Sequence, residues 1–230
     1  MKRVAILQSN YIPWKGYFDL INIADEFILY DDMQYTKRDW RNRNKIQTPN
    51  GLQWLSIPVM VKGKYFQKIS NTKISDNSWG KKHWAVLKQN YSKAAYFKVY
   101  KDIFEELYLN NKDEYLSQVN YKFICAIKQI LGISTKVRWS SDFDLADGQS
   151  EKLLGICKDC DADIYLSGPA AKDYLDENIF MRNKIKIEWM TYNNYPEYKQ
   201  LFEPFDHGVT ILDLIFNEGE NATKFMKSFN

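Results

Sequence analysis

Residues 4–18 read VAILQSNYIPWKGYF, and residues 27–30 read FILY. The apolar run at 4–7 is typical of a buried strand, the apolar spacing at 16–24 indicates a short helix, and 27–30 predicts a second strand. Because a short connection containing a helix joins these strands, we expect them to lie parallel with a right-handed crossover. This stretch therefore predicts the opening strand, helix and strand of an α/β protein.

The rest of the chain continues this alternation of strands and helices. Further strands are expected at 52–58, 135–139, 163–166 and 184–189, and helices at 149–158 and 209–216. Residues 33–48 are too polar and basic for a core element. Between about 78 and 131 there is no proline, and apolar residues recur at helical spacing, which predicts three helices. We predict one α/β domain over residues 1–230, with a mostly parallel Rossmann-like sheet and a helical insertion at about 78–131.

Composition excludes several classes of protein. The 230 residues are 45% hydrophobic, which is enough for a sizeable core. No stretch approaches the roughly 18 apolar residues of a membrane span, and the N-terminus does not resemble a signal peptide, so a cytoplasmic location is expected. Cys157 and Cys160 form a CxxC, and Cys125 is the third cysteine, but no second pair or histidine cluster completes a zinc site. Reduced thiols are therefore favoured over a redox role, and no metal site is predicted.

Charge is distributed unevenly along the chain. The net charge is +3, yet residues 37–98 contain 14 Lys or Arg and only two acids, Asp39 and Asp76, which leaves the remainder of the chain acidic. This asymmetry is typical of a surface that faces a polyanion, whether the phosphates of a nucleotide, a nucleic acid or a membrane. For the dispersed lysines from Lys62 to Lys98, a solvated lysine-rich face remains an equal alternative.

Polar clusters follow three of the predicted strands. They are Gln8, Ser9, Asn10 and Tyr11; then Asp31 and Asp32; and then Ser167, Gly168 and Pro169. Ligands of open parallel sheets bind at the carboxyl ends of the strands, so these clusters are candidates for one site. Taken alone, the Ser-Gly-Pro-Ala turn is better explained as a loop and helix cap. The two aspartates are candidates for holding a cation or for accepting the proton of an amine. Adjacent residues of an extended chain point in opposite directions, so only one of the two is expected to face the site.

The densest chemical signal lies around Trp40. Five cations lie within nine residues there: Lys37, Arg38, Arg41, Arg43 and Lys45. A guanidinium offers forked donors that match a phosphate, and an indole offers a face for a base or a sugar. The segment therefore predicts a phosphorylated ligand, with an exposed basic loop as the alternative.

Three residues are candidates for proton transfer: His83, His207 and Asp32. The two histidines are the only ones in the chain, and histidine is the usual proton carrier near neutral pH, although a lone histidine more often has a structural role. The sequence contains no GxSxG, Walker loop, GxGxxG or HExxH motif, so no serine or cysteine nucleophile is assigned.

Four long motifs together identify a family resemblance. They are QSNYIPWKGYFDLIN (8–22), ADEFILYDDMQYTKRDWRNRNKI (24–46), DADIYLSGPAAKDYLD (161–176) and HGVTILDLIFN (207–217). Nearly the whole chain resembles the WbqC-like family. The resemblance implies a bacterial protein of O-antigen (lipopolysaccharide) and related polysaccharide biosynthesis, which transfers glycine or a similar aminoacyl group to the amine of an amino sugar.

A fainter resemblance concerns the fold alone. The opening unit resembles the nucleotide-binding domains of pantothenate synthetase and nucleotidyl transferases. Those enzymes carry an HxGH motif at the turn where this chain has Trp14-Lys15-Gly16-Tyr17. The absence of both histidines makes nucleotidyl transfer the third-ranked function, while a nucleotide-shaped crevice is still expected.

The sequence thus predicts an acyltransferase acting on a nucleotide-linked amino sugar. Gln8, Asn10, Tyr11, Trp14 and Tyr17 would recognise a sugar or base, and Lys37, Arg41 and Arg43 would hold a diphosphate. His83, His207 or Asp32 would take the proton of the amine. The resemblance implies an activated donor, either an aminoacyl-tRNA or an acyl thioester, and no other cofactor is predicted. The rival prediction is a non-catalytic module that binds nucleic acid, such as tRNA, through the basic segment 37–98.

Overall fold

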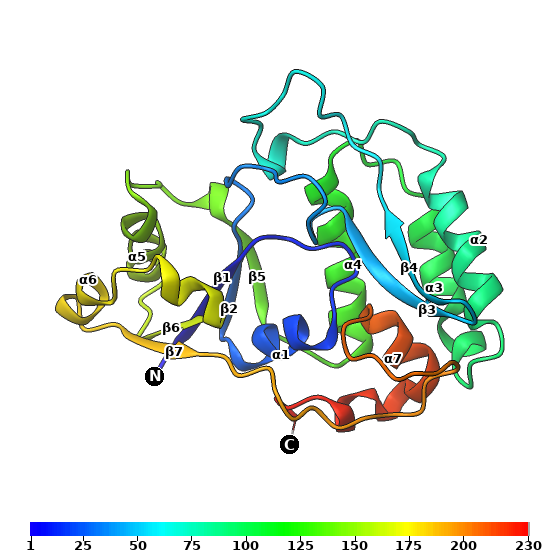
Figure 1. Ribbon diagram of the computed structural model, residues 1–230. Coiled ribbons are helices and arrows are strands. Elements are labelled where there is room, and N and C mark those ends of the chain that lie inside the picture. The colour runs from blue at the N-terminus through cyan, green and yellow to red at the C-terminus, as the bar shows by residue number, and fades with distance from the viewer. Residues whose placement is uncertain (230) are drawn as a thin grey trace.

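The central sheet is parallel throughout. The computed structural model describes residues 1–229, and five strands pair side by side in the order β5-β2-β1-β6-β7 (Figure 1). The strands are β1 (Arg3–Leu7), β2 (Glu26–Leu29), β5 (Lys136–Trp139), β6 (Ile164–Ser167) and β7 (Lys186–Trp189). This is the Rossmann-like α/β fold that the opening stretch predicts. The chain builds outward from β1 through β2 and β5, then returns to the other side of β1 with β6, so the switch point lies between β1 and β6.

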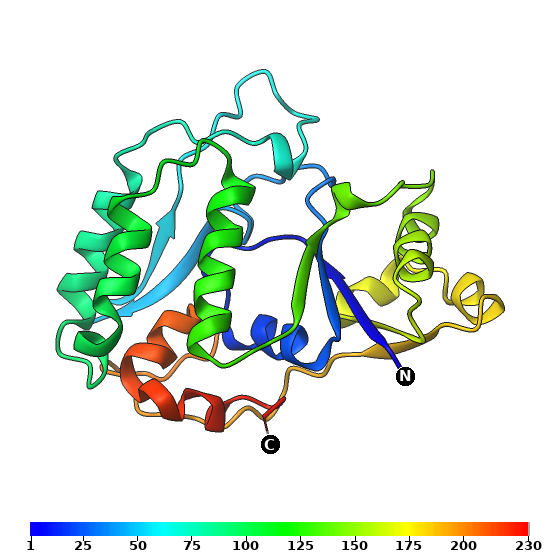
Figure 2. The same cartoon turned by 180° about the vertical axis from the view of Figure 1, so that it is seen from behind.

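Alternate residues of β1 face two different cores, as the period of a strand requires. Val4 and Ile6 lie in the core that α5 (Gln149–Asp159) and α6 (Glu177–Arg182) cover. Ala5 lies in the opposite core, which includes side chains of five other helices: α1 (Lys15–Ile23), α2 (Trp79–Tyr91), α3 (Phe97–Leu109), α4 (Leu116–Ile130) and α7 (Ile211–Glu218). The two views agree that α5 and α6 lie on one side of the sheet and the remaining helices on the other (Figures 1 and 2).

Three helices occupy the middle of the chain, which confirms the three helices predicted there from the spacing of apolar residues. They are α2, α3 (Phe97–Leu109) and α4. Aromatic stacking joins the first two, because the Trp84 ring lies parallel to Phe97 at 5.8 Å and to Tyr108 at 6.0 Å between centroids. These rings are buried, so they contribute to packing rather than to a binding surface.

The expectation that residues 33–48 hold no core element is wrong for their last six residues. An antiparallel hairpin forms from β3 (Arg43–Thr48) and β4 (Gly51–Ser56), separate from the main sheet. Asn44 and Ile46 of β3 are buried. The Asn44 amide donates to the carbonyl oxygens of Ile12 at 2.8 Å and Tyr11 at 3.3 Å. A polar residue can therefore occupy an inward position because its hydrogen bonds are satisfied.

The cysteines are free thiols, and burial raises the pKa of the Cys160 thiol to about 11. Across residues 1–229, no cluster of three or more His, Cys, Asp or Glu could hold a metal ion. Within the same range, no helix combines the length and apolar character needed to cross a bilayer.

Candidate functional site

A crevice of about 210 Å³ lies at the switch point of the sheet. Its walls include Gln8 after β1, Tyr30 after β2, and Ser167 and Gly168 at the end of β6. Arg41 reaches the same crevice from the segment before β3. The structure thus brings together four of the predicted binding residues, Gln8, Arg41, Ser167 and Gly168, although they are up to 160 positions apart in the sequence.

A second cavity of about 290 Å³ has aromatic and amide walls. It is lined by Asn10, Pro13, Trp14, Trp40, Asn44 and Gly208. The Trp14 ring is held edge-on against Tyr192 and Tyr195, with centroids 5.3 and 5.5 Å away. Trp40 is 41% exposed, and its ring lies 5.4 Å from that of Trp54. The indoles of Trp14 and Trp40 therefore face the same cavity. The Trp14 ring is packed against two tyrosines, and the Trp40 ring is exposed to solvent.

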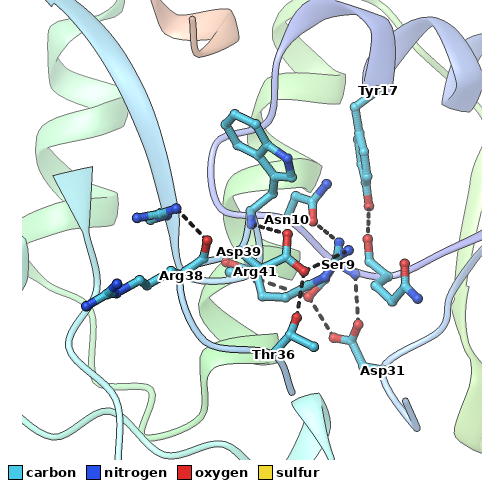
Figure 3. Close-up of polar contacts among 12 residues, drawn as sticks. Ser9, Asn10, Tyr17, Asp31, Thr36, Arg38, Asp39 and Arg41 are labelled. Atoms are coloured by element: carbon cyan, nitrogen blue, oxygen red, sulfur yellow. Dashed lines mark hydrogen bonds and ion pairs between the residues drawn. The ribbon is translucent and has the colours of Figure 1, made fainter. Parts of the chain in front are cut away.

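The pair formed by Arg41 and Asn10 joins the two cavities. Arg41 Nη1 donates a hydrogen bond to Asn10 Oδ1, as Figure 3 shows. Arg41 lines the crevice and Asn10 lines the aromatic cavity. Arg41 Nη2 also lies 3.7 Å from Asp39 Oδ2, so one side of the guanidinium is oriented by a carboxylate. A ligand that spans both cavities would pass this pair.

A buried polar network lies behind Arg41. The Ser9 amide and hydroxyl donate to the two oxygens of Asp31, at 2.8 and 2.7 Å (Figure 3). Asn120 of α4 donates both to Ser9 Oγ at 3.0 Å and to the Arg41 carbonyl oxygen at 2.9 Å. Burial raises the pKa of the Asp31 carboxyl, which is 1% exposed. Asp31 and Asn120 therefore fix the loop after β1 to the backbone of Arg41.

Sequence reasoning did not select Asn120, although a signal was present. Its neighbours Val119 and Phe123 belong to the apolar stripe of α4, and Asn120 is itself fully buried. An amide beside a helical stripe that faces the core must find hydrogen-bond partners there, which marks it as a structural anchor.

His83 lies in the core, where both of its ring nitrogens are engaged. Nε2 lies 3.2 Å from the Ser56 carbonyl oxygen, which can only accept, so Nε2 carries the proton. Nδ1 then accepts from the Tyr11 hydroxyl at 2.8 Å. Burial lowers the pKa of His83 to about 4. Tyr11 is also fully buried and hydrogen-bonds Tyr108 at 2.7 Å, so neither Tyr11 nor His83 lines the crevice or the aromatic cavity.

Asp32 is held in a different way. Its Oδ1 accepts from Lys68 Nζ at 2.8 Å, and its Oδ2 accepts from Ser140 Oγ at 2.7 Å. Burial acts to raise the pKa of Asp32, but these two hydrogen bonds outweigh it, and the net effect is a lowered pKa. Both carboxylate oxygens already have partners, which makes Asp32 a poor acceptor for a substrate proton.

His207 lies beside the aromatic cavity, next in sequence to Gly208. Its ring is partly buried and lies 4.6 Å from that of Phe205, and within residues 1–229 its Nδ1 has no hydrogen-bond partner. Burial and the nearby Lys15 ammonium lower the pKa of His207. The lowered pKa favours the neutral form of the imidazole near pH 7, and the unpartnered Nδ1 is itself buried.

The remaining predicted residues lie outside the two cavities. Tyr17 is buried, and its hydroxyl donates to the Gln8 carbonyl oxygen at 3.1 Å, which supports the crevice wall (Figure 3). Lys37 lines a hollow together with residues 61–67. The Arg38 carbonyl accepts from Arg43 Nη2 at 2.5 Å, and the Arg43 guanidinium lies 4.0 Å above the Trp54 ring.

The structure therefore brings only one of the three expected diphosphate ligands, Arg41, to the crevice. The backbone turns through a positive φ of 58° at Arg38, and β3 begins at Arg43. These two features send the neighbouring cations in different directions.

The strand order and the crevice at the switch point define a Rossmann-like α/β protein. A model of the WbqC-like protein family matches residues 8–225, so the chain belongs to that family. It is 50% identical over 227 residues to "Uncharacterized protein Rv1507c" of Mycobacterium tuberculosis, and the match covers 99% of this chain and 98% of that protein. No solved structure matches the chain.

Proposed function

We propose that this protein is an acyltransferase that moves glycine, or another aminoacyl or acyl group, to the amine of a nucleotide-linked amino sugar. The observation that carries the proposal is the pair of cavities that meet at Arg41 and Asn10. One cavity has the position and the cation suited to a phosphorylated ligand. The other has the indoles and amides suited to a sugar.

The two halves of such a substrate match the two cavities. The diphosphate would lie against the Arg41 guanidinium, whose forked donors can bind two phosphate oxygens at once. The sugar would lie between Trp14 and Trp40, because the C–H face of a pyranose packs well on an indole. Asn10 and Asn44 would then offer amide donors and acceptors to the sugar hydroxyls.

His207 is the residue best suited to take the amine proton. In the transfer, the amine nitrogen attacks the acyl carbonyl carbon, a C–N bond forms, and the C–O or C–S bond to the donor breaks. The amine proton moves to the His207 imidazole and then to the departing alcohol or thiolate. Charge on the carbonyl oxygen would be stabilised by backbone amides at the turn after Ser167 or by Arg41.

A binding experiment with matched variants tests this proposal. The purified protein is titrated at fixed low salt with UDP- and dTDP-linked amino sugars, the parent nucleotides and bulk tRNA, and thermal shift and calorimetry are recorded. Arg41→Ala should weaken binding of both nucleotide and nucleotide sugar at least tenfold. Trp14→Leu should abolish the preference for the sugar-linked form. Arg182→Ala, which removes an exposed arginine on α6, is the matched control and should change neither.

Two results would contradict the proposal. One is a protein that responds to tRNA alone, which would favour the nucleic-acid-binding alternative. The other is equal weakening by Arg41→Ala and Arg182→Ala, which would mean that overall charge, not the crevice, governs nucleotide binding.

A further inference from the structure

Residues 60–67, here called the tip loop, carry two aromatic rings into solvent. Tyr65 is 72% and Phe66 is 83% exposed, and their rings stand nearly perpendicular, with centroids 4.9 Å apart and planes at 89°. In both views the segment projects at the top of the molecule, beyond the carboxyl edge of the sheet (Figures 1 and 2). Adjacent exposed rings at a projecting point are typical of a contact surface.

Hydrogen bonds hold the tip loop in this shape. Gln67 Nε2 donates to the Met60 carbonyl oxygen at 2.8 Å and closes the base of the loop. Gln34 Nε2 donates to the Tyr65 carbonyl oxygen at 2.9 Å and ties it to the segment after β2. The backbone turns at Gly63, which has a φ of +71° that favours glycine. The two rings are therefore directed outward by an ordered loop.

The charge around these rings is positive. Lys37, Lys62 and Lys64 lie around the same hollow as Tyr65 and Phe66. Within residues 1–229, none of these three lysines forms an ion pair. No Asp or Glu occurs anywhere from residue 40 to residue 75. A partner of this surface must therefore combine negative charge with a region that accepts apolar rings.

We propose that the tip loop docks on the surface of an anionic lipid bilayer. The Tyr65 and Phe66 rings would enter the interfacial region, where aromatic side chains are favoured, and Lys62 and Lys64 would lie among the headgroup phosphates. The ring geometry favours lipid over single-stranded nucleic acid, because two perpendicular rings cannot both continue one stack of bases. Docking would turn the carboxyl edge of the sheet toward the bilayer. The inference does not depend on the proposed acyltransferase function.

Vesicle co-sedimentation of the full chain tests this inference. The vesicles are 30% phosphatidylglycerol in phosphatidylcholine, or phosphatidylcholine alone, at two salt concentrations. We expect at least tenfold stronger partitioning to the anionic vesicles and a loss of that difference at high salt, because salt screens the lysine–headgroup attraction. Two double variants are compared: Tyr65→Ser with Phe66→Ser, and Lys62→Ser with Lys64→Ser. Each should lower the partition coefficient at least tenfold.

The matched control is Val99→Ser with Ile103→Ser, which removes exposed apolar side chains from α3. It should partition as the unmodified chain does. The inference is overturned if the unmodified chain does not sediment with anionic vesicles. It is also overturned if both tip-loop variants sediment with them as well as the unmodified chain does. Loss of oligothymidylate binding in these variants, with vesicle binding unchanged, would also overturn it and would identify single-stranded nucleic acid as the partner.

Discussion

The environment of His83 predicts a pH dependence of stability that His83→Gln should remove. Its pKa is about 4 in the folded protein, because of burial, against an ordinary value of 6.5. Between these pH values the unfolded chain binds more protons than the folded chain, so stability is fully present above pH 6.5 and falls as the pH drops toward 4. At about 1.4 kcal/mol per pH unit, the loss reaches about 2.5 kcal/mol by pH 4.5.

Urea unfolding followed by tryptophan fluorescence, at several pH values from 7.5 to 4.5, measures this term. At pH 7.5, His83→Gln should be less stable by about 1–3 kcal/mol, because the Tyr11 hydroxyl loses its acceptor in the core. That deficit should shrink by about 2.5 kcal/mol on acidification to pH 4.5. Other titrating groups cancel in the difference between the two proteins. Parallel stability curves would refute the reasoning, because they would mean that His83 titrates as an exposed histidine does.

Three other substitutions test the packing and the site. Gly80→Ala should cost at least about 2 kcal/mol in urea unfolding, because a Cβ would overlap the Tyr108 carbonyl oxygen where α2 meets α3. Gly155→Ala has open space around the new methyl group and lies within α5, so it should instead stabilise by about 0.5–1 kcal/mol, and a loss would contradict the helix packing. Asn120→Ala should cost about 1–3 kcal/mol and also weaken nucleotide binding in calorimetry, because the Arg41 carbonyl loses its donor; unchanged affinity would separate this network from the site.

The parallel core of the fold could be predicted from the sequence because each strand is a short apolar run between helical segments. The runs at 4–7 and 27–30 consist almost entirely of apolar residues, and the structure pairs them in parallel. Such runs are buried on both faces and carry no information on lateral order, so the position of β6 beside β1 came only from the structure. The strand β3 was missed because its buried Asn44 is polar, and composition does not show that its amide finds partners in another segment.

The proximity of some candidate site residues could be predicted for a similar reason. Gln8 and Ser167 follow strands, and strand ends in a parallel sheet converge, so proximity followed from topology. Tyr11 and His83 have residue types that suit a binding site equally well, but burial decides their role, and burial depends on which helix packs over them. Gly208 was missed because a glycine contributes only backbone to a wall.

The cations of the basic segment 37–98 are close in the sequence but lie at separate places in the folded protein. Arg41 reaches the crevice, and the Arg43 guanidinium lies over the Trp54 ring of the hairpin. Lys37 lines the hollow beside the tip loop. A continuous nucleic-acid groove would require these cations to follow one path along a backbone. Their separation instead favours two smaller anionic partners, a phosphorylated ligand at Arg41 and a charged surface at Lys62 and Lys64. The same local charge of the chain is therefore divided between the two proposed sites, and substitutions should remove them independently.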